Sequence, residues 1–202
     1  MAKGGTKTGS GTVKRRYADL NSGPLGDAHN AHGERVILDN PGTGVAVRAY
    51  SGTSYAKVNR GLRQGEPPDE VAQRLDTLFA DKNARFQQDS RVYRGIGFND
   101  PIRRALEEGT LRAGATLTDK GFVSTSVNPE VAQFFATFVG DRSAILRIRA
   151  RKGKRGVHIE KFSKHKSERE TLLPRGSRFK VRGVTEGKAG AVPALFVDVD
   201  LM

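Results

Sequence analysis

The sequence predicts an α+β fold, in which two mostly antiparallel β-sheets pack face to face and helices cover their flanks. Apolar residues recur at helical spacing from Val45 to Leu62 and again after Pro67. Beyond residue 90 the chain changes to short β-branched or aromatic runs separated by turn residues, which is typical of strands. A length of 202 residues suits one domain with its own core. A cleft between the sheets is the expected ligand site.

The first half of the chain is expected to be helical. Residues 1–16 are rich in Gly, Ser, Thr and Lys and predict a flexible basic arm. Residues 17–202 are expected to form a single domain, with an irregular lead-in over 17–45 and a recognisable core over 45–202. The helical pattern of 45–62 is interrupted near Ser51 and Gly52, and a second helix is expected from Pro67 to about Phe86. The residues expected to face the core from this second helix are Val71, Leu75, Leu78 and Phe79.

The second half is expected to be mostly strands. Two short helices, Pro101–Glu108 and Pro129–Phe138, should interrupt them, with Asp100 and Asn128 as their N-caps. The expected strands are Arg91–Ile96, Gly121–Ser126, Ala144–Ala150, Gly156–Ile159, Glu170–Leu173, Arg178–Val181 and Ala194–Leu201.

Charge and composition narrow the class of protein. The net charge of +13 comes entirely from residues 1–16, with five basic groups and no acid, and residues 141–166, with ten basic groups and two acids. Such segments can steer a protein to an acidic partner or to nucleic acid, or can simply be solvated. The absence of Cys excludes disulfides and thiolate chemistry. No apolar run reaches the roughly 20 residues that cross a bilayer, so we expect a soluble protein with no membrane partner.

Three short motifs carry candidate chemistry. Arg94 sits late in a strand before Gly95, whose backbone a ligand can approach closely, and an Arg there can clamp a phosphate. Three hydroxyls, Ser124, Thr125 and Ser126, end a later strand and can bond a ribose or hold a neighbouring carboxylate. Each motif by itself is equally compatible with a surface residue or a helix lead-in.

The third motif is a pair of carboxylates, Glu168 and Glu170, at the entry to a strand. The two-residue period of a strand predicts that both point to the same side. Like charges held together usually have raised or split pKa values. One carboxylate could stabilise an oxocarbenium-like sugar cation while the other positions a nucleophile, as in glycosidic cleavage. An exposed pair of Glu at a strand edge is the plainer alternative.

Taken together and in this order, the motifs resemble the arginine-serine-glutamate class of mono-ADP-ribosyltransferases, the superfamily of bacterial ADP-ribosylating exotoxins. The resemblance runs from about Tyr50 to Leu201. It rests on Tyr-Arg-Gly at 93–95, Ser-Thr-Ser at 124–126 and Glu-Arg-Glu at 168–170, together with a helical signature over 50–63. The resemblance implies an ADP-ribosyltransferase-like fold with a central NAD cleft, with NAD as co-substrate and no metal.

The resemblance also implies roles for individual residues. Arg94 would bind the NAD phosphates, and Ser124 would support the nicotinamide ribose and Glu170. Glu170 would bond the ribose 2′-hydroxyl and stabilise the cation that forms as nicotinamide leaves. Glu168 would orient and help deprotonate the acceptor, and a Glu at that place implies transfer to protein arginine.

Further NAD contacts are expected from two helices. Tyr55, Asn59 and Arg63 are spaced by four and so share one helix face, which the resemblance places at the adenosine and phosphate end of NAD. An aromatic residue of the helix after Ser126, Phe135 or its neighbour Phe134, would pack near the nicotinamide. Core packing is the alternative for these aromatics, because Phe138 lies at helical spacing from Phe134.

The basic turn over residues 161–167 corresponds by position to the loop that recognises the target in this family. Phe162 is expected there as an exposed anchor, and the surrounding target-recognition residues are Lys164, His165 and Lys166. A lone His in a Lys-rich turn is more often solvent-exposed than catalytic.

Three other hypotheses remain open: an NAD glycohydrolase, an enzyme that modifies nucleic acid or a nucleic-acid-bound protein, and a non-catalytic basic nucleic-acid-binding or virion module. Without a conventional signal peptide, we expect a toxin or effector secreted or injected by a specialised system, or delivered by a phage, that acts in the target cytoplasm. A cognate immunity protein is a candidate partner in the toxin case.

Overall fold

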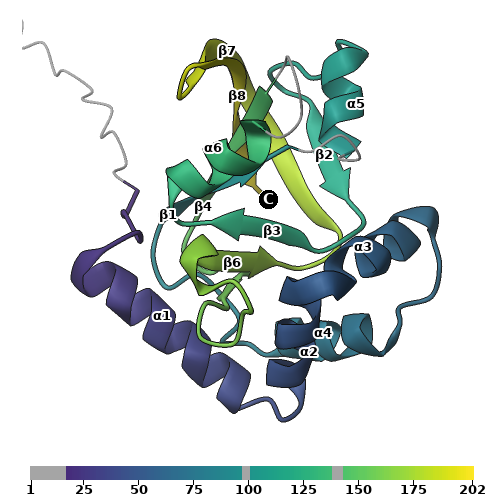
Figure 1. Ribbon diagram of the computed structural model, residues 1–202, viewed down its shortest axis with the longest axis vertical. Coiled ribbons are helices and arrows are strands. Elements are labelled where there is room, and N and C mark those ends of the chain that lie inside the picture. Colours follow the sequence, from purple (N-terminus) through teal and green to yellow (C-terminus); the bar gives the residue numbers. More distant parts are fainter. Residues whose placement is uncertain (1–16, 97–100, 138–142) are drawn as a thin grey trace, which may run out of the picture.

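The computed structural model describes residues 17–96, 101–137 and 143–202. The expected arm over 1–16, the expected cap Asp100 and the aromatic Phe138 lie outside these described residues. Helices α1 to α4, purple to blue in Figure 1, lie together at one end of the molecule beside β6, whereas α5 and α6 lie toward the opposite end. The strands run between these two groups of helices, so the α+β fold class expected from the sequence is confirmed.

The irregular lead-in expected over residues 17–45 is wrong, because α1 spans Gly23–Leu38. Pro24, taken as a turn former, instead opens this helix, where its missing N–H costs nothing. The helix lacks an apolar stripe because part of its buried face consists of Gly26, His29 and Gly33. A Cβ on Gly33 would collide with the main chain at His158, so a glycine allows the close packing of α1 on the sheet.

The helical pattern of 45–62 is confirmed, including its interruption. Helix α2 spans Thr43–Ala49 and α3 spans Tyr55–Gln64. Between them the π-helical turn η1, Tyr50–Ser54, contains Gly52 in a non-helical conformation. The break turns Tyr50 into the protein, where it is fully buried.

Helix α4 spans Glu70–Ala80 and is capped by Asp69, whose side chain accepts from the amide of Ala72. Its core-facing residues were predicted correctly: Leu75, Leu78 and Phe79 are buried and Val71 is partly buried. The helix is shorter than expected, since the Asp81 side chain accepts from the amide of Asn83 and turns the chain before Phe86.

The sheet is built mainly from the expected strands. Within the described residues the strands are β1 (Ser90–Gly95), β2 (Thr116–Asp119), β3 (Val123–Ser126), β4 (Ser143–Ala150), β5 (Val157–His158), β6 (Glu170–Leu173), β7 (Ser177–Ala189) and β8 (Val192–Leu201). The short β2 was not expected, and β7 extends well beyond Val181 because it forms a long hairpin with β8. All pairings are antiparallel except that of β4 with β8.

The expectation of two separate sheets is wrong, because the strands form one sheet in the order β2-β7-β8-β4-β1-β3-β6-β5. The only registered pair between β1 and β3 is Tyr93 with Ser126, whereas β1 pairs with β4 along its whole length. Alternating apolar patterns cannot reveal such a narrow connection, since they report which face of a strand is buried and not which edges join.

Helix α6 covers the sheet near this connection. The helix α5 spans Pro101–Glu107, and α6 spans Pro129–Thr137 and packs on β1, β3 and β4. Asn128 caps α6 as expected, accepting from the amide of Glu130. Strand β6 is buried on both faces, because Leu172 belongs to the core cluster under α2 and α4 and Leu173 belongs to the cluster of β1, β4, β7 and β8. Glu170 therefore begins a strand whose position is strongly constrained.

Candidate active site

A cavity of about 1430 Å³ opens where β1, β3 and β6 meet helices α3, α5 and α6. Four of its lining residues are those on which the sequence analysis placed the chemistry, namely Arg94, Ser124, Glu168 and Glu170. The other residues predicted for NAD binding also line it: Tyr55, Asn59, Arg63, Gly95, Thr125, Ser126 and Phe135. The fold thus brings into one place residues from segments more than 100 positions apart.

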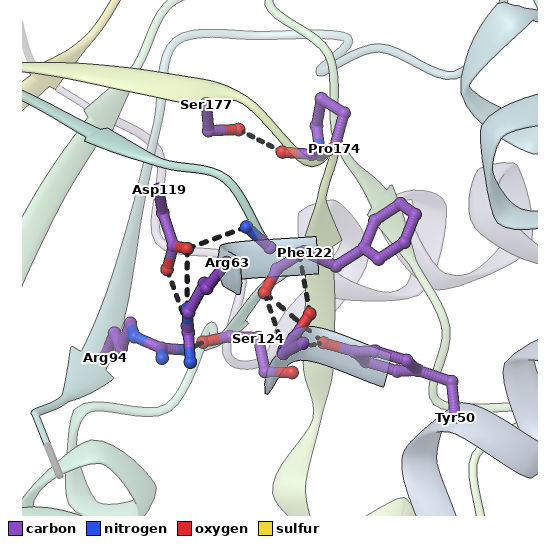
Figure 2. A network of polar contacts seen from close by, with 10 residues as sticks. Tyr50, Arg63, Arg94, Asp119, Phe122, Ser124, Pro174 and Ser177 are labelled. Atoms are coloured by element: carbon purple, nitrogen blue, oxygen red, sulfur yellow. Dashed lines mark hydrogen bonds and ion pairs between the residues drawn. The ribbon is translucent and has the colours of Figure 1, made fainter. Parts of the chain in front are cut away.

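Arg94 reaches across the narrow connection in the sheet. Its Nη1 donates a 2.8 Å hydrogen bond to the main-chain carbonyl of Ser124, and both residues are half-buried (Figure 2). Gly95 lines the cavity and also has a packing role that was not expected. A Cβ there would meet the main chain of α6 at Ala132 and Ala136, so this glycine allows the helix to pack closely on β1.

The three hydroxyl residues on β3 divide into two roles. Thr125 and Ser126 are buried, and their hydroxyls donate to the main-chain carbonyls of Thr171 and Glu168, the latter at 2.7 Å. These two side chains therefore hold β6 and the turn before it. Ser124 is left facing the cavity near Glu170 and the hydroxyl of Tyr50, and its side chain lowers the pKa of both groups.

The two carboxylates reach the same cavity, but not by strand alternation. Glu168 ends a short 3₁₀ turn, η2 (Lys166–Glu168), and is half-buried. Arg169 then adopts a left-handed conformation with φ of 47°, and it is the only non-glycine residue with positive φ among those the structure describes. Glu170 follows as the buried first residue of β6, paired with Ser126. The two-residue period assumes an extended backbone at every position, so it cannot predict a left-handed residue.

Burial raises the pKa of Glu170 to about 7, an effect that the hydrogen bond from Ser124 opposes, the neighbouring Glu168 increases and Arg94 opposes. Burial also raises the pKa of Glu168, although His165 nearby acts in the opposite direction. A buried carboxylate held beside a second acid and an Arg is the arrangement expected where a positive charge develops during a reaction.

Tyr50 is a cavity residue that the sequence analysis did not single out. Its hydroxyl accepts a 2.8 Å hydrogen bond from Asn59 and donates to the carbonyl of Phe122 at 3.3 Å (Figure 2). Burial first, and then the charge of Glu170, raise its pKa to about 12, so it stays a neutral phenol. A tyrosine inside an apolar helical run has the same pattern as a core residue, so nothing in the sequence distinguished it.

The three residues on one face of α3 line the cavity as predicted, although two of their side chains already bond to other residues of the protein. The Asn59 amide bonds both the carbonyl and the N–H of Phe122. Arg63 forms a bidentate ion pair with the buried Asp119 at 2.8 and 3.0 Å, drawn in Figure 2. Only Tyr55 projects into solvent, with 53% of its surface exposed.

The aromatic pair on α6 lies at the surface. Phe134 is 58% and Phe135 is 44% exposed, and their rings stack edge to face. Core packing does not account for either, and Phe135 is the one that lines the cavity.

The basic turn is placed beside the cavity, with one correction. Phe162 is not an exposed anchor: it is half-buried against the core cluster of α1 to α4 and touches Gly44 of α2. The sequence could not reveal this contact because the two segments lie far apart in the chain. Lys164 and Lys166 are exposed, and His165 is exposed and lines the cavity next to Glu168.

Three charged residues of the cavity could not be predicted from the sequence. Arg60, Arg104 and Lys120 come from α3, α5 and the segment after β2, and they line the cavity together with the acidic Glu107 of α5. They belong to no recognisable spacing, and only the fold brings them together. Separately, no helix among the described residues is long and apolar enough to cross a membrane.

Comparisons with known proteins agree with this geometry. Residues 41–202 match the family described as ADP-ribosyltransferase exoenzyme. The chain is 30% identical over 174 residues to secreted exoenzyme S of Pseudomonas aeruginosa, covering 85% of this chain and 34% of that protein. It is 28% identical over 145 residues to the NAD(+)–arginine ADP-ribosyltransferase EFV of Enterococcus faecalis, covering 67% of this chain and 28% of that protein. The chain thus spans about a third or less of these relatives.

Among solved structures, the fold is similar to that of Plx2a, an ADP-ribosyltransferase toxin from Paenibacillus larvae. The TM-score is 0.70 at 18% sequence identity, over 88% of this chain and 94% of that one. At that identity the likeness concerns the fold alone.

Proposed function

Because this chain belongs to the ADP-ribosyltransferase exoenzyme family, we propose that it cleaves NAD and transfers the ADP-ribose to arginine on a target protein. The observation that carries the proposal is the placement of Arg94, Ser124, Glu168 and Glu170 around one cavity, with Glu170 buried.

The cavity suits a dinucleotide together with part of an acceptor. Small-molecule sites usually measure about 300–1,000 Å³, and this cavity is larger at about 1430 Å³. Arg94, fixed on the carbonyl of Ser124, offers its guanidinium to a diphosphate. The cations Arg60, Arg104 and Lys120 of the cavity lining outnumber the nearby Glu107 and add a favourable field for an anionic ligand.

Glu170 is the group that fits the bond-breaking step. As the bond between the ribose and nicotinamide breaks, the electron pair leaves with nicotinamide and positive charge develops on the ribose. A carboxylate in a partly dehydrated cavity stabilises that charge more strongly than one in water. The side chain of Ser124 favours the ionised form of Glu170, because it lowers the pKa of that carboxyl.

Glu168 fits the transfer step. It is less buried than Glu170 and stands beside His165 at the edge of the cavity, where an acceptor can reach it. A guanidino nitrogen that attacks the ribose carbon must lose one proton, and Glu168, whose pKa is raised by burial, can take it. The name of the Enterococcus relative states arginine as its acceptor, which supports arginine here.

The NAD glycohydrolase hypothesis differs only in the acceptor, since water replaces the guanidine. Modification of nucleic acid rests on the basic segments alone, and a non-catalytic binding module would require Glu170 to have no chemical role. We also propose that the protein acts as a secreted or injected effector on a target cell, in line with the name of its Pseudomonas relative.

The test is to incubate the purified chain with isotope-labelled NAD and a host-cell lysate, and to identify adducts by mass spectrometry. We expect a mono-ADP-ribose adduct on arginine in the wild-type reaction and none with Glu170→Gln. Free ADP-ribose without any adduct would favour the glycohydrolase, and an adduct on nucleic acid would replace protein arginine as the acceptor.

A further inference from the structure

We propose that Glu160, held by His158, is a positioning residue that anchors Arg169 and thereby sets the placement of Glu168 for transfer. The inference rests on the proposed function and adds residues that lie outside the cavity. Neither Glu160 nor His158 lines the cavity, and the ion pair of Glu160 with Arg169 links it to the turn that carries Glu168.

Arg169 occupies the position on which the carboxylate pair depends. Its left-handed backbone, with φ of 47°, is unfavourable for a residue with a long side chain. Main-chain bonds hold it on either side, from its own amide to Lys166 and from the amide of Val127 to its carbonyl. Its Nε lies 3.7 Å from Oε2 of Glu160, an ion pair longer than a hydrogen bond. This Nε is shielded from solvent and has no hydrogen-bond partner among the described residues, and it belongs to a side chain that is 28% exposed. The side chain thus adds a tether from the turn to the segment after β5.

A buried polar chain fixes Glu160 in turn. His158 Nε2 lies 3.0 Å from the same Oε2 atom, and His158 Nδ1 lies 3.0 Å from the hydroxyl of Thr171. Because the carboxylate can only accept, His158 carries its proton on Nε2 and Nδ1 accepts from Thr171. Thr171 in turn faces Nε2 of His29 at 3.3 Å. Each member of the chain therefore has a donor or acceptor role that fits its neighbour.

His158 acts as a neutral donor in this arrangement. Burial first, and then the charge of Arg169, lower its pKa to about 4. Because the neutral imidazole of His158 carries no positive charge, it does not offset the negative charge of Glu160. That charge therefore attracts the guanidinium of Arg169.

The two catalytic carboxylates differ in how much they need this tether. Glu170 is fixed by the β6 ladder, through its pairing with Ser126 and the bond from the amide of Ile159 to its carbonyl. Glu168 has no strand to hold it, and its carbonyl is fixed by the hydroxyl of Ser126. Release of Arg169 should therefore displace Glu168 more than Glu170, and transfer should suffer more than NAD cleavage by water.

The first test is Glu160→Gln, which keeps an acceptor for His158 but removes the charge that faces Arg169. We expect transfer to a small guanidino acceptor to fall about tenfold, hydrolysis by less than about threefold, and the KM for NAD to stay within about twofold. The matched control is Glu186→Gln, an exposed acid on β7 with the same change of charge. Equal losses of transfer and hydrolysis, or no loss, would overturn the proposal.

A double-mutant cycle separates the tether from general damage. Arg169→Gly removes the side chain yet accepts the left-handed conformation, so adding Glu160→Gln to it should cause no further loss. Additive losses would contradict a shared role. Independently of activity, the Arg169 Nε–H resonance should shift in Glu160→Gln and not in Glu186→Gln. If the wild-type chain turns over no NAD, the proposed function fails, while an unchanged Nε–H resonance overturns this inference.

Discussion

Arg94 on β1 donates a 2.8 Å hydrogen bond to the main-chain carbonyl of Ser124 on β3, across the point where the two strands share a single registered pair. The bond fixes the guanidinium beside the cavity before any ligand arrives. A preorganised cation of this kind loses less side-chain entropy when it binds a phosphate.

Arg94→Ala should therefore weaken NAD binding, because a phosphate clamp acts on the ground state and the transition state alike. Hydrogen bonds to charged groups contribute about 1.5–3 kcal/mol, so the Kd should rise by roughly ten- to a hundredfold. Calorimetric titration with NAD measures this directly. Arg91→Ala is the matched control, since Arg91 is exposed on the same strand and stacks over Tyr17. Equal affinities of the Arg94 and Arg91 variants would contradict the clamp.

Glu170→Gln should make the protein more stable at neutral pH while removing its activity. The pKa of Glu170 is raised in the folded state to about 7, so the folded protein keeps a proton that the unfolded chain releases above pH 4.5. Stability contributed by this group therefore falls as the pH rises from about 4.5 to 7. The variant has no such titrating group, so its free energy of unfolding should exceed that of the wild type by about 1–3 kcal/mol at pH 8. At pH 4.5 the two should differ little. Urea unfolding at the two pH values measures this difference in stability. A difference that does not depend on pH would show that the titration of Glu170 is not its cause.

The rate of NAD cleavage should fall on the acidic side of pH 7. Only the ionised form of Glu170 can stabilise a cation, and its pKa in the free protein is about 7. The kcat/KM for nicotinamide release should decrease about tenfold per pH unit well below that value. A rate that stays constant from pH 5.5 to 8 would show that Glu170 is ionised throughout or does not act in this step.

The basic turn should affect the encounter with the target and not the chemistry. Lys161, Lys164 and Lys166 are exposed beside the cavity edge marked by His165. Replacing the three Lys by Ser should slow modification of a protein target at low salt, and the deficit should shrink as salt rises, because exposed charges are screened over about 8 Å at physiological ionic strength. Hydrolysis of NAD by the same variant serves as the control. An unchanged rate of target modification at low salt would leave the turn without a recognition role.

Much of the fold was predictable from local patterns, and its exceptions have physical causes. The capped, amphipathic α4 and most strands are plain in the sequence because each buries apolar residues at a regular period. Helix α1 was missed because Gly26, His29 and Gly33 form part of its buried face. The single registered pair between β1 and β3 could not be predicted, because side-chain patterns do not show which strand edges pair.

Many residues that line the cavity could be predicted from the sequence, but their geometry could not. Glu168 and Glu170 share a cavity because Arg169 is left-handed, and Gly95 serves the packing of α6. Phe162 is half-buried because α2 lies against it. Each of these depends on a contact or a backbone conformation that residue types and spacing do not encode, and the same is true of Tyr50 in the cavity wall.

Glu168 and Glu170 are proposed to act in different steps, and one measurement tests this division of roles directly. Nicotinamide release and formation of the ADP-ribosyl-guanidine adduct are followed in the same reaction for the wild type, Glu168→Gln and Glu170→Gln. Glu168→Gln should lose the adduct yet keep measurable nicotinamide release, since water needs less positioning than a guanidinium. Glu170→Gln should lose both by a factor on the order of 100–1,000 or more. Equal loss of adduct and nicotinamide release in Glu168→Gln, or near wild-type release in Glu170→Gln, would contradict the assignment.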